Sequence, residues 1–280
     1  MNFKILLMAA ALTGVQSQAV AEKANVSNKV TTTDEIEWGY LNPLRGDQSP
    51  GAADLWGDRT KNMATGMLVK FREGFSSPPH IHNITYRGVV IKGLLHNDDP
   101  KAEKMWLPES SFWVQPAGES HITAAGASEN MAYIEIDSGP YLVKPTAEAF
   151  ENGEKPINVD AANLVWLPAP ELVWIDSNNS INSPQAAFLW GQRDKNGLNG
   201  SLIKLPVGFK GEITSPNDTF RAVVIQGEVT YGAEKPASKQ LQPGSYFESN
   251  GEFKHQITTT DKHTEAIIYI RTNGQYQITD

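Results

Sequence analysis

The chain has 280 residues, with 24 Lys and Arg against 32 Asp and Glu, and a formal net charge of −8. It contains no cysteine, which excludes disulfide bonds, thiol nucleophiles and thiolate metal sites. The acidic balance, with no basic run, argues against nucleic acid and anionic membranes as partners.

Residues 1–21 have the pattern of a signal peptide. A basic start at Lys4 is followed by an apolar run from Ile5 to Val15 and by the small-residue cleavage pattern Ala19-Val20-Ala21. We therefore expect a mature chain that begins near Glu22 and is periplasmic or secreted. No later segment is long and apolar enough to span a bilayer, so we expect no membrane insertion.

Residues 22–48 are predicted to form an N-terminal arm and one edge strand. The stretch from Glu22 to Asp34 is polar and rich in Thr, which favours a frayed arm, and Ile36 to Tyr40 is expected to pair at a sheet edge.

An internal repeat organises the rest of the chain. GFSSPPHIHNITYRGVVIKG, which starts at Gly74, recurs as GFKGEITSPNDTFRAVVIQG, 134 positions later, and a Leu-Trp-Gly motif before it recurs at the same spacing. This predicts a first unit at 49–145, a connector at 146–163 with a helix at 146–152, and a second unit at 164–280.

Each unit is predicted to be all-β. Short β-rich runs, separated by Gly, Pro, Asn and Asp, include 67–71, 86–91, 111–115 and 131–136. Many short strands with almost no helical periodicity are typical of antiparallel sandwiches and barrels.

Three histidines of the first unit are candidates for metal ligands. His80 and His82 are two residues apart on a predicted strand, so their side chains project to the same face. A Pro-x-Gly turn at 116–118 could bring His121 beside them. Neutral imidazoles at this spacing could bind one divalent ion, and Fe, Zn, Ni, Mn and Cu all accept such ligands.

The same residues resemble the two motifs of the cupin superfamily. Gly74, five residues, His80-x-His82 and Gly93 are similar to the first motif, and Pro116-x-Gly118-x-x-His121 is similar to the second. The resemblance implies two tandem cupin-type double-stranded β-helix (jelly-roll) barrels, as in secreted bacterial bicupins of unknown function.

Two positions depart from that pattern. Tyr86 and Arg87 stand where cupins usually carry a Glu ligand, and Ser110 stands where the second motif usually opens with Gly. A three-His site without a carboxylate resembles that of three-His cupin dioxygenases.

The second unit lacks the corresponding histidines. His80, His82 and Tyr86 become Thr214, Pro216 and Phe220, and only His121 has a counterpart, His255. We therefore expect a degenerate, metal-free second barrel. Because the phenol of Tyr86 is lost with the ligands, Tyr86 is the candidate catalytic residue, as a hydrogen-bond donor to bound ligand or a distant ligand.

Simpler roles are expected for other conspicuous residues. Trp56 and Trp190 recur in both copies, which favours packing, and His96 and His263 are interpreted as exposed loop residues. His255 is expected to bond to backbone or to be a former ligand. Gln115 and Glu119 could line the mouth of the metal barrel or lie on the surface.

Two classes of function remain open from the sequence. One is a metal-dependent dioxygenase or lyase that acts on a small oxygenated compound, and the other is a non-catalytic small-ligand or metal-sensing binding protein. Both imply a small-molecule ligand, and pairing of cupin-like barrels makes a homodimer an expectation.

Overall fold

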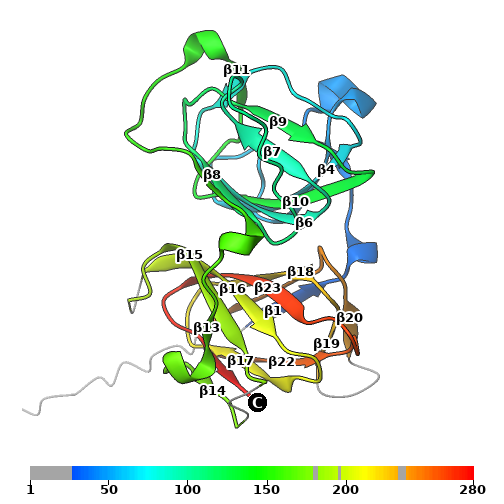
Figure 1. Ribbon diagram of the computed structural model, residues 1–280, viewed down its shortest axis with the longest axis vertical. Coiled ribbons are helices and arrows are strands. Elements are labelled where there is room, and N and C mark those ends of the chain that lie inside the picture. The colour runs from blue at the N-terminus through cyan, green and yellow to red at the C-terminus, as the bar shows by residue number, and fades with distance from the viewer. Residues whose placement is uncertain (1–26, 179–181, 195–196, 233–237) are drawn as a thin grey trace, which may run out of the picture.

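The computed structural model describes residues 27–280 except 179–181, 195–196 and 233–237, and it consists of two β-lobes joined by a long connection (Figure 1). The predicted signal peptide, residues 1–21, lies outside the described residues, as do residues 22–26 of the predicted arm.

The first lobe is a barrel built from one large sheet and two strand pairs. The large sheet has the order β12-β8-β6-β10-β4-β3-β2, and the pairs are β5 with β11 and β7 with β9. The strands are β2 (Gly39–Tyr40), β3 (Gly51–Trp56), β4 (Thr65–Arg72), β5 (His80–His82), β6 (Tyr86–Lys92), β7 (Leu95–Asp98), β8 (Phe112–Gln115), β9 (Ile122–Ala125), β10 (Glu129–Ile136), β11 (Val143–Pro145) and β12 (Ile157–Val159).

The second lobe is a barrel of two sheets, ordered β1-β21-β18-β23-β16-β15-β13 and β14-β24-β17-β22-β19-β20. Its strands are β1 (Ser27–Thr31), β13 (Leu167–Pro168), β14 (Ile175–Asp176), β15 (Gln185–Gly191), β16 (Leu198–Leu205), β17 (Lys210–Ser215), β18 (Phe220–Gln226), β19 (Val229–Tyr231), β20 (Lys239–Leu241), β21 (Tyr246–Asn250), β22 (Phe253–Thr259), β23 (Ala266–Asn273) and β24 (Gln277–Thr279). The predicted all-β, jelly-roll architecture is confirmed.

Helical structure among the described residues is limited to five short 3₁₀ turns: η1 (Thr33–Glu35), η2 (Pro43–Gln48), η3 (Thr146–Glu148), η4 (Ala161–Asn163) and η5 (Ala169–Glu171). The helix expected at 146–152 was therefore predicted too long. Ala149 already has an extended backbone, with φ −59° and ψ 144°, and the chain continues without helical bonds. A single helical turn without a packed apolar face has little to stabilise its extension.

The prediction of a frayed arm is wrong for its described part. β1 pairs over five residues with β21, so the N-terminal strand completes the sheet of the second lobe (Figure 1). In the opposite direction, β12 of the connector pairs with β8 of the first lobe. The segment before each barrel thus adds a strand to the other one. Such pairing satisfies backbone groups that an open edge would expose.

The expected edge strand at 36–40 forms only at its end. β2 covers Gly39 and Tyr40 and pairs with β3.

Three apolar clusters hold the molecule together. One fills each lobe, and the third lies between the lobes and contains residues of both, among them Leu68, Val89, Leu202 and Val223. Burial of this shared cluster removes apolar surface of both lobes from water at the joint.

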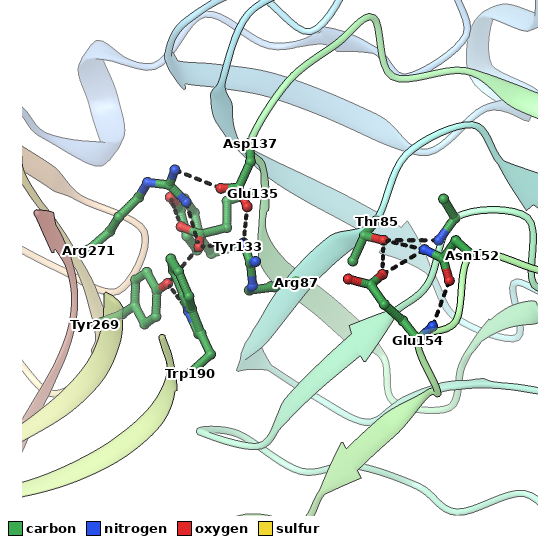
Figure 2. A network of polar contacts seen from close by, with 11 residues as sticks. Thr85, Arg87, Tyr133, Glu135, Asp137, Asn152, Glu154, Trp190, Tyr269 and Arg271 are labelled. Atoms are coloured by element: carbon green, nitrogen blue, oxygen red, sulfur yellow. Dashed lines mark hydrogen bonds and ion pairs between the residues drawn. The ribbon is translucent and has the colours of Figure 1, made fainter. Parts of the chain in front are cut away.

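Trp56 and Trp190 serve packing, as predicted, and the packing is at the joint between the lobes. Each indole N–H donates to a buried phenol, Trp56 to Tyr133 at 3.1 Å and Trp190 to Tyr269 at 2.9 Å. Each ring is also covered by an arginine of the other lobe at 3.8 Å, Arg221 over Trp56 and Arg87 over Trp190. Figure 2 shows part of this network.

Candidate metal centre

Three histidines meet inside the first barrel. His80 and His82 are the ends of β5, whose approach is stiffened by Pro78 and Pro79. His80 and His121 exchange two backbone hydrogen bonds of 3.0 Å, so the turn at 116–118 returns the chain beside β5. All three imidazoles are buried. The predicted convergence of His80, His82 and His121 is what the structure shows.

The spacing of the ring nitrogens fits one ion. The ligand atoms of the three histidines lie within 4.8 Å of one another, and the Nε2 atoms of His80 and His82 are 3.2 Å apart. Two nitrogens at about 2.0–2.1 Å from an ion and separated by that distance subtend an angle of about 100°, between octahedral and tetrahedral values.

The backbone selects the tautomer of each ring. The Nδ1 atoms of His80, His82 and His121 lie 2.9 Å, 3.0 Å and 3.2 Å from the carbonyl oxygens of Pro78, Leu142 and Glu119. A carbonyl can only accept, so each Nδ1 carries the proton and each Nε2 presents a lone pair.

These lone pairs face one another in a buried site. Two unprotonated nitrogens 3.2 Å apart have no hydrogen to share, and a cation between them satisfies both. Hydrogen bonds from the far nitrogen to fixed acceptors are also what orients ligating histidines in metal sites. The residues present therefore fit a divalent ion.

Burial keeps the three imidazoles neutral. Desolvation of the charged form lowers the pKa of His80 and lowers the pKa of His82 far below its usual value, and it lowers the pKa of His121 to about 3. The neighbouring rings add a smaller repulsion to the last two. Neutral imidazole is the form that ligates, so protons compete weakly for this site near neutral pH.

Tyr86 points into the same site, on the inward face that its spacing from the histidines predicts. Its hydroxyl donates to Oδ1 of Asn97 at 2.8 Å, and its oxygen lies 3.3 Å from Nε2 of His121. Because the hydroxyl proton is engaged by Asn97, the phenol oxygen presents a lone pair to the site, which fits a distant ligand or an acceptor and not the expected hydrogen-bond donor to bound ligand. Burial raises the pKa of the Tyr86 phenol well above its usual value, which keeps it protonated.

A polar chain behind Tyr86 holds this arrangement. The amide of Asn97 donates to Oε1 of Gln115 at 2.9 Å, and Gln115 in turn donates to the carbonyl of Glu119 at 3.2 Å. Thr123 donates a second hydrogen bond to Oδ1 of Asn97 at 2.8 Å. Gln115 is thus buried inside the barrel, and Glu119 acts through its backbone.

Tyr141 is a site residue that sequence reasoning missed. Its ring stacks on His82 with centroids 4.3 Å apart, and its hydroxyl donates to Nε2 of His82 at 3.2 Å. The second copy keeps a tyrosine here, Tyr276, so comparison of the copies could not single it out. Asn97 was also missed, since it lies in a stretch interpreted as a loop.

His96 was interpreted wrongly as an exposed loop residue. It lies on β7 and is 1% exposed, with Nδ1 3.3 Å from the carbonyl of Met105 and its ring edge against Trp106. The chain turns back after β7, so that Met105 and Trp106 contact His96, and the stretch interpreted as a loop contains a strand. His263 is exposed, as predicted.

The second barrel is filled at the equivalent place. His255 is buried among aromatic rings, including Phe220 at a centroid distance of 4.6 Å. Its two ring nitrogens contact the hydroxyls of Tyr231 at 2.8 Å and Ser249 at 3.0 Å, so its partners are side chains and not the expected backbone. Within the described residues, the only group of three metal-ligating side chains is that of the first barrel.

A small cavity of about 120 Å³ opens beside the histidines. His80, His82, Tyr86 and Tyr141 line its polar side. Its other walls are mostly apolar and include Leu41, Val69, Phe71, Phe75, Trp113, Ile134 and Val143. The volume is below the roughly 300–1,000 Å³ of pockets for drug-sized ligands, so only a small molecule fits.

Solved structures with this architecture place the chain in a known fold class. A proposed dioxygenase from Nostoc punctiforme is 16% identical, with a TM-score of 0.63 over 88% of this chain and 82% of that chain. Hazelnut (Corylus avellana) vicilin is 11% identical, with a TM-score of 0.53 over 89% and 87%. Bacillus subtilis oxalate decarboxylase, studied for its Mn(II) centres, is 12% identical, with a TM-score of 0.51 over 92% and 80%. At these identities the likeness shows the fold alone, the jelly-roll barrel fold that the cupin-like motifs of the sequence imply.

The family is shown by the sequence itself. Residues 29–279 match a family described as a domain of unknown function (DUF4437), and the chain belongs to that family. None of the curated proteins matches the chain. In the part of the chain that the structure describes, no helix is long and apolar enough to cross a membrane.

Proposed function

We propose that the protein is an exported metal-dependent enzyme, a dioxygenase or lyase, that acts on a small oxygenated compound in its first barrel. The observation that carries the proposal is the set of three Nε2 lone pairs, each turned inward by a hydrogen bond from Nδ1 to a carbonyl. The proposal of export rests on the pattern of residues 1–21.

His80, His82 and His121 would hold the ion. A divalent ion bound there supplies Lewis acidity and open coordination positions for an oxygen-bearing ligand. Because the three ligands are neutral, they leave the charge of the ion uncompensated. The Mn(II) centres of the oxalate decarboxylase and the name of the Nostoc protein support this class of chemistry.

The chain's own groups would position the substrate. The phenol oxygen of Tyr86, held by Asn97, is placed to accept a hydrogen bond from a ligand. The hydroxyl of Tyr141 would lose its acceptor when an ion takes the Nε2 lone pair of His82, and it could then donate to a ligand. The apolar walls exclude water, which strengthens such interactions.

The test is metal analysis of the purified protein, followed by O₂ uptake and CO₂ release with a panel of small oxygenated compounds. We expect one metal equivalent per chain and turnover of some compounds, both lost in His82→Ala. Metal-dependent binding without turnover of any compound would favour the non-catalytic binding protein. Protein without metal after reconstitution would reject both.

A further inference from the structure

We infer that the substrate of this site is a small carboxylate and that Arg45 binds its negative charge. The inference rests on the proposed function and names its substrate class. It comes from a short segment, residues 41–50, that crosses the rim of the cavity and that we call the strap.

The strap is held in one conformation at both ends. Leu41 donates its N–H to the carbonyl of Pro50 at 2.9 Å, and the N–H of Asn42 donates to Oγ of Ser49 at 2.9 Å. Between these bonds lies η2, whose start is capped by Oδ1 of Asn42 at 3.0 Å from the N–H of Leu44. The strap is therefore a built loop, and five of its residues line the cavity: Leu41, Asn42, Arg45, Ser49 and Pro50.

Among the described residues that line the cavity, Arg45 is the only one with a charged side chain. An ion held by the histidines would add a second positive charge. No Asp or Glu is among the lining residues, and Arg45 has no ion pair within the described chain. The other arginines of the first lobe have carboxylate or amide partners: Arg59 with Asp54, Arg87 with Asp137, and Arg72 with Gln48. Arg45 is exposed, so its guanidinium is free to receive a ligand.

The strap can be compared with the equivalent segment of the second copy. Leu41, Ser49 and Pro50, which anchor the strap, become Ile175, Ser183 and Pro184 at the constant offset of 134. Arg45 becomes Asn179. Similar residue types thus recur at the anchor positions, although Ile175 donates its N–H to Leu172 and not to Pro184, and the arginine occurs only in the copy with three histidines.

Charge and shape together define the ligand. The cavity is lined by neutral histidines, one guanidinium and no carboxylate, so it attracts an anion. The chain as a whole, with a net charge of −8, repels anions. Guanidinium presents paired N–H donors that match the two oxygens of a carboxylate. The apolar walls favour a short hydrocarbon body, and a volume of about 120 Å³, or roughly four water molecules, limits its size.

The experiment compares one acid with its neutral analogue. Binding of 2-methylpropanoate and of 2-methylpropanamide is measured by calorimetry on the full mature protein, after metal reconstitution and metal analysis of the same sample. We expect the acid to bind more tightly than the amide. In Arg45→Gln the affinity for the acid should fall about tenfold or more, because an ionic hydrogen bond is lost, and that for the amide should not change.

Arg72→Gln is the matched control, since it removes the same charge from the same lobe at an exposed residue that does not line the cavity, and whose contact with the strap is a single long bond of 3.5 Å to Gln48. It should leave both affinities unchanged. Equal affinity of wild type and Arg45→Gln for the acid, in samples with one bound metal, would overturn the inference and leave the proposed function standing. A sample that holds no metal contradicts the proposed function instead. Because Arg45 is exposed, its substitution should not unfold the protein.

Discussion

The guanidinium of Arg271 in the second lobe donates to the carboxylate of Glu135 in the first lobe at 3.0 Å, and both side chains are almost fully buried, at 3% and 1% exposure. The hydroxyls of Tyr269 and Tyr133 also donate to Glu135, at 2.8 Å and 3.0 Å. Figure 2 shows these groups converging on one carboxylate. The two lobes are therefore joined by a buried charge pair in which Nη1 and Nη2 of Arg271 are hydrogen-bonded to carboxylates, whereas its buried Nε has no partner.

Removal of that carboxylate should weaken the joint strongly. In Glu135→Gln, Arg271 stays buried with only Asp137 as a charged partner, and the unfolding free energy should fall by about 3 kcal/mol. Asp137→Asn, whose side chain is 45% exposed, should cost less than about 1 kcal/mol. Denaturant unfolding at pH 7 measures both. Equal losses in the two variants would show that burial does not distinguish the two carboxylates.

The metal content of the protein should depend only on the histidines of the first barrel. We expect one equivalent per chain in wild type, loss in His82→Ala because a two-histidine remnant binds weakly, and full retention in His255→Ala. Elemental analysis after reconstitution and desalting measures this. A second equivalent that disappears with His255 would place an ion in the barrel that we describe as filled.

Tyr86 should be needed for turnover and not for metal. Tyr86→Phe removes the hydroxyl that bonds Asn97 and faces His121, while the three ligands keep their carbonyl partners. We expect unchanged metal content and a turnover lower by about 100-fold, the order of magnitude of a lost acid–base or polar contact. Tyr86→Phe protein with full turnover would remove Tyr86 from the chemistry.

Acid should destabilise the protein through His255. Desolvation lowers the pKa of His255 to about 3 in the folded protein, against about 6.5 when unfolded, so the unfolded chain binds more protons between these values. The contribution of neutral, buried His255 to the free energy of unfolding is fully present above pH 6.5 and is lost as the pH falls from 6.5 toward 3. At pH 5 the cost is about 2 kcal/mol.

The measurement compares wild type with His255→Gln, both metal-free, by denaturant unfolding at pH 7.5 and pH 5. The difference in stability should shrink by about 2 kcal/mol at the lower pH, because Gln does not titrate. The control His263→Gln, at an exposed position, should leave the wild-type pH dependence in place. A parallel shift of wild type and His255→Gln would show that His255 does not titrate in this way.

The sequence alone was sufficient for the elements whose signals are local. Alternating and short β-rich runs predicted the all-β fold, because side-chain alternation and turn residues depend on neighbours along the chain. The same-face placement of His80 and His82, and the inward direction of Tyr86, follow from strand parity. The absence of partner histidines in the second copy indicated which barrel carries the site.

Only the tertiary structure decided what depends on contacts distant in sequence. β1 belongs to the second lobe because its backbone partners lie more than 200 residues away in β21, and no local pattern specifies such a partner. His96 is buried where the chain turns back and brings Met105 and Trp106 against it. Tyr141 reaches His82 across 59 positions, and Arg45 reaches the same cavity from the segment between β2 and β3. His80 and His82 could be predicted from their short-range spacing, and His121 from the turn and motif before it. The groups that surround the ligands are brought in by long-range packing, which the order of residues does not display.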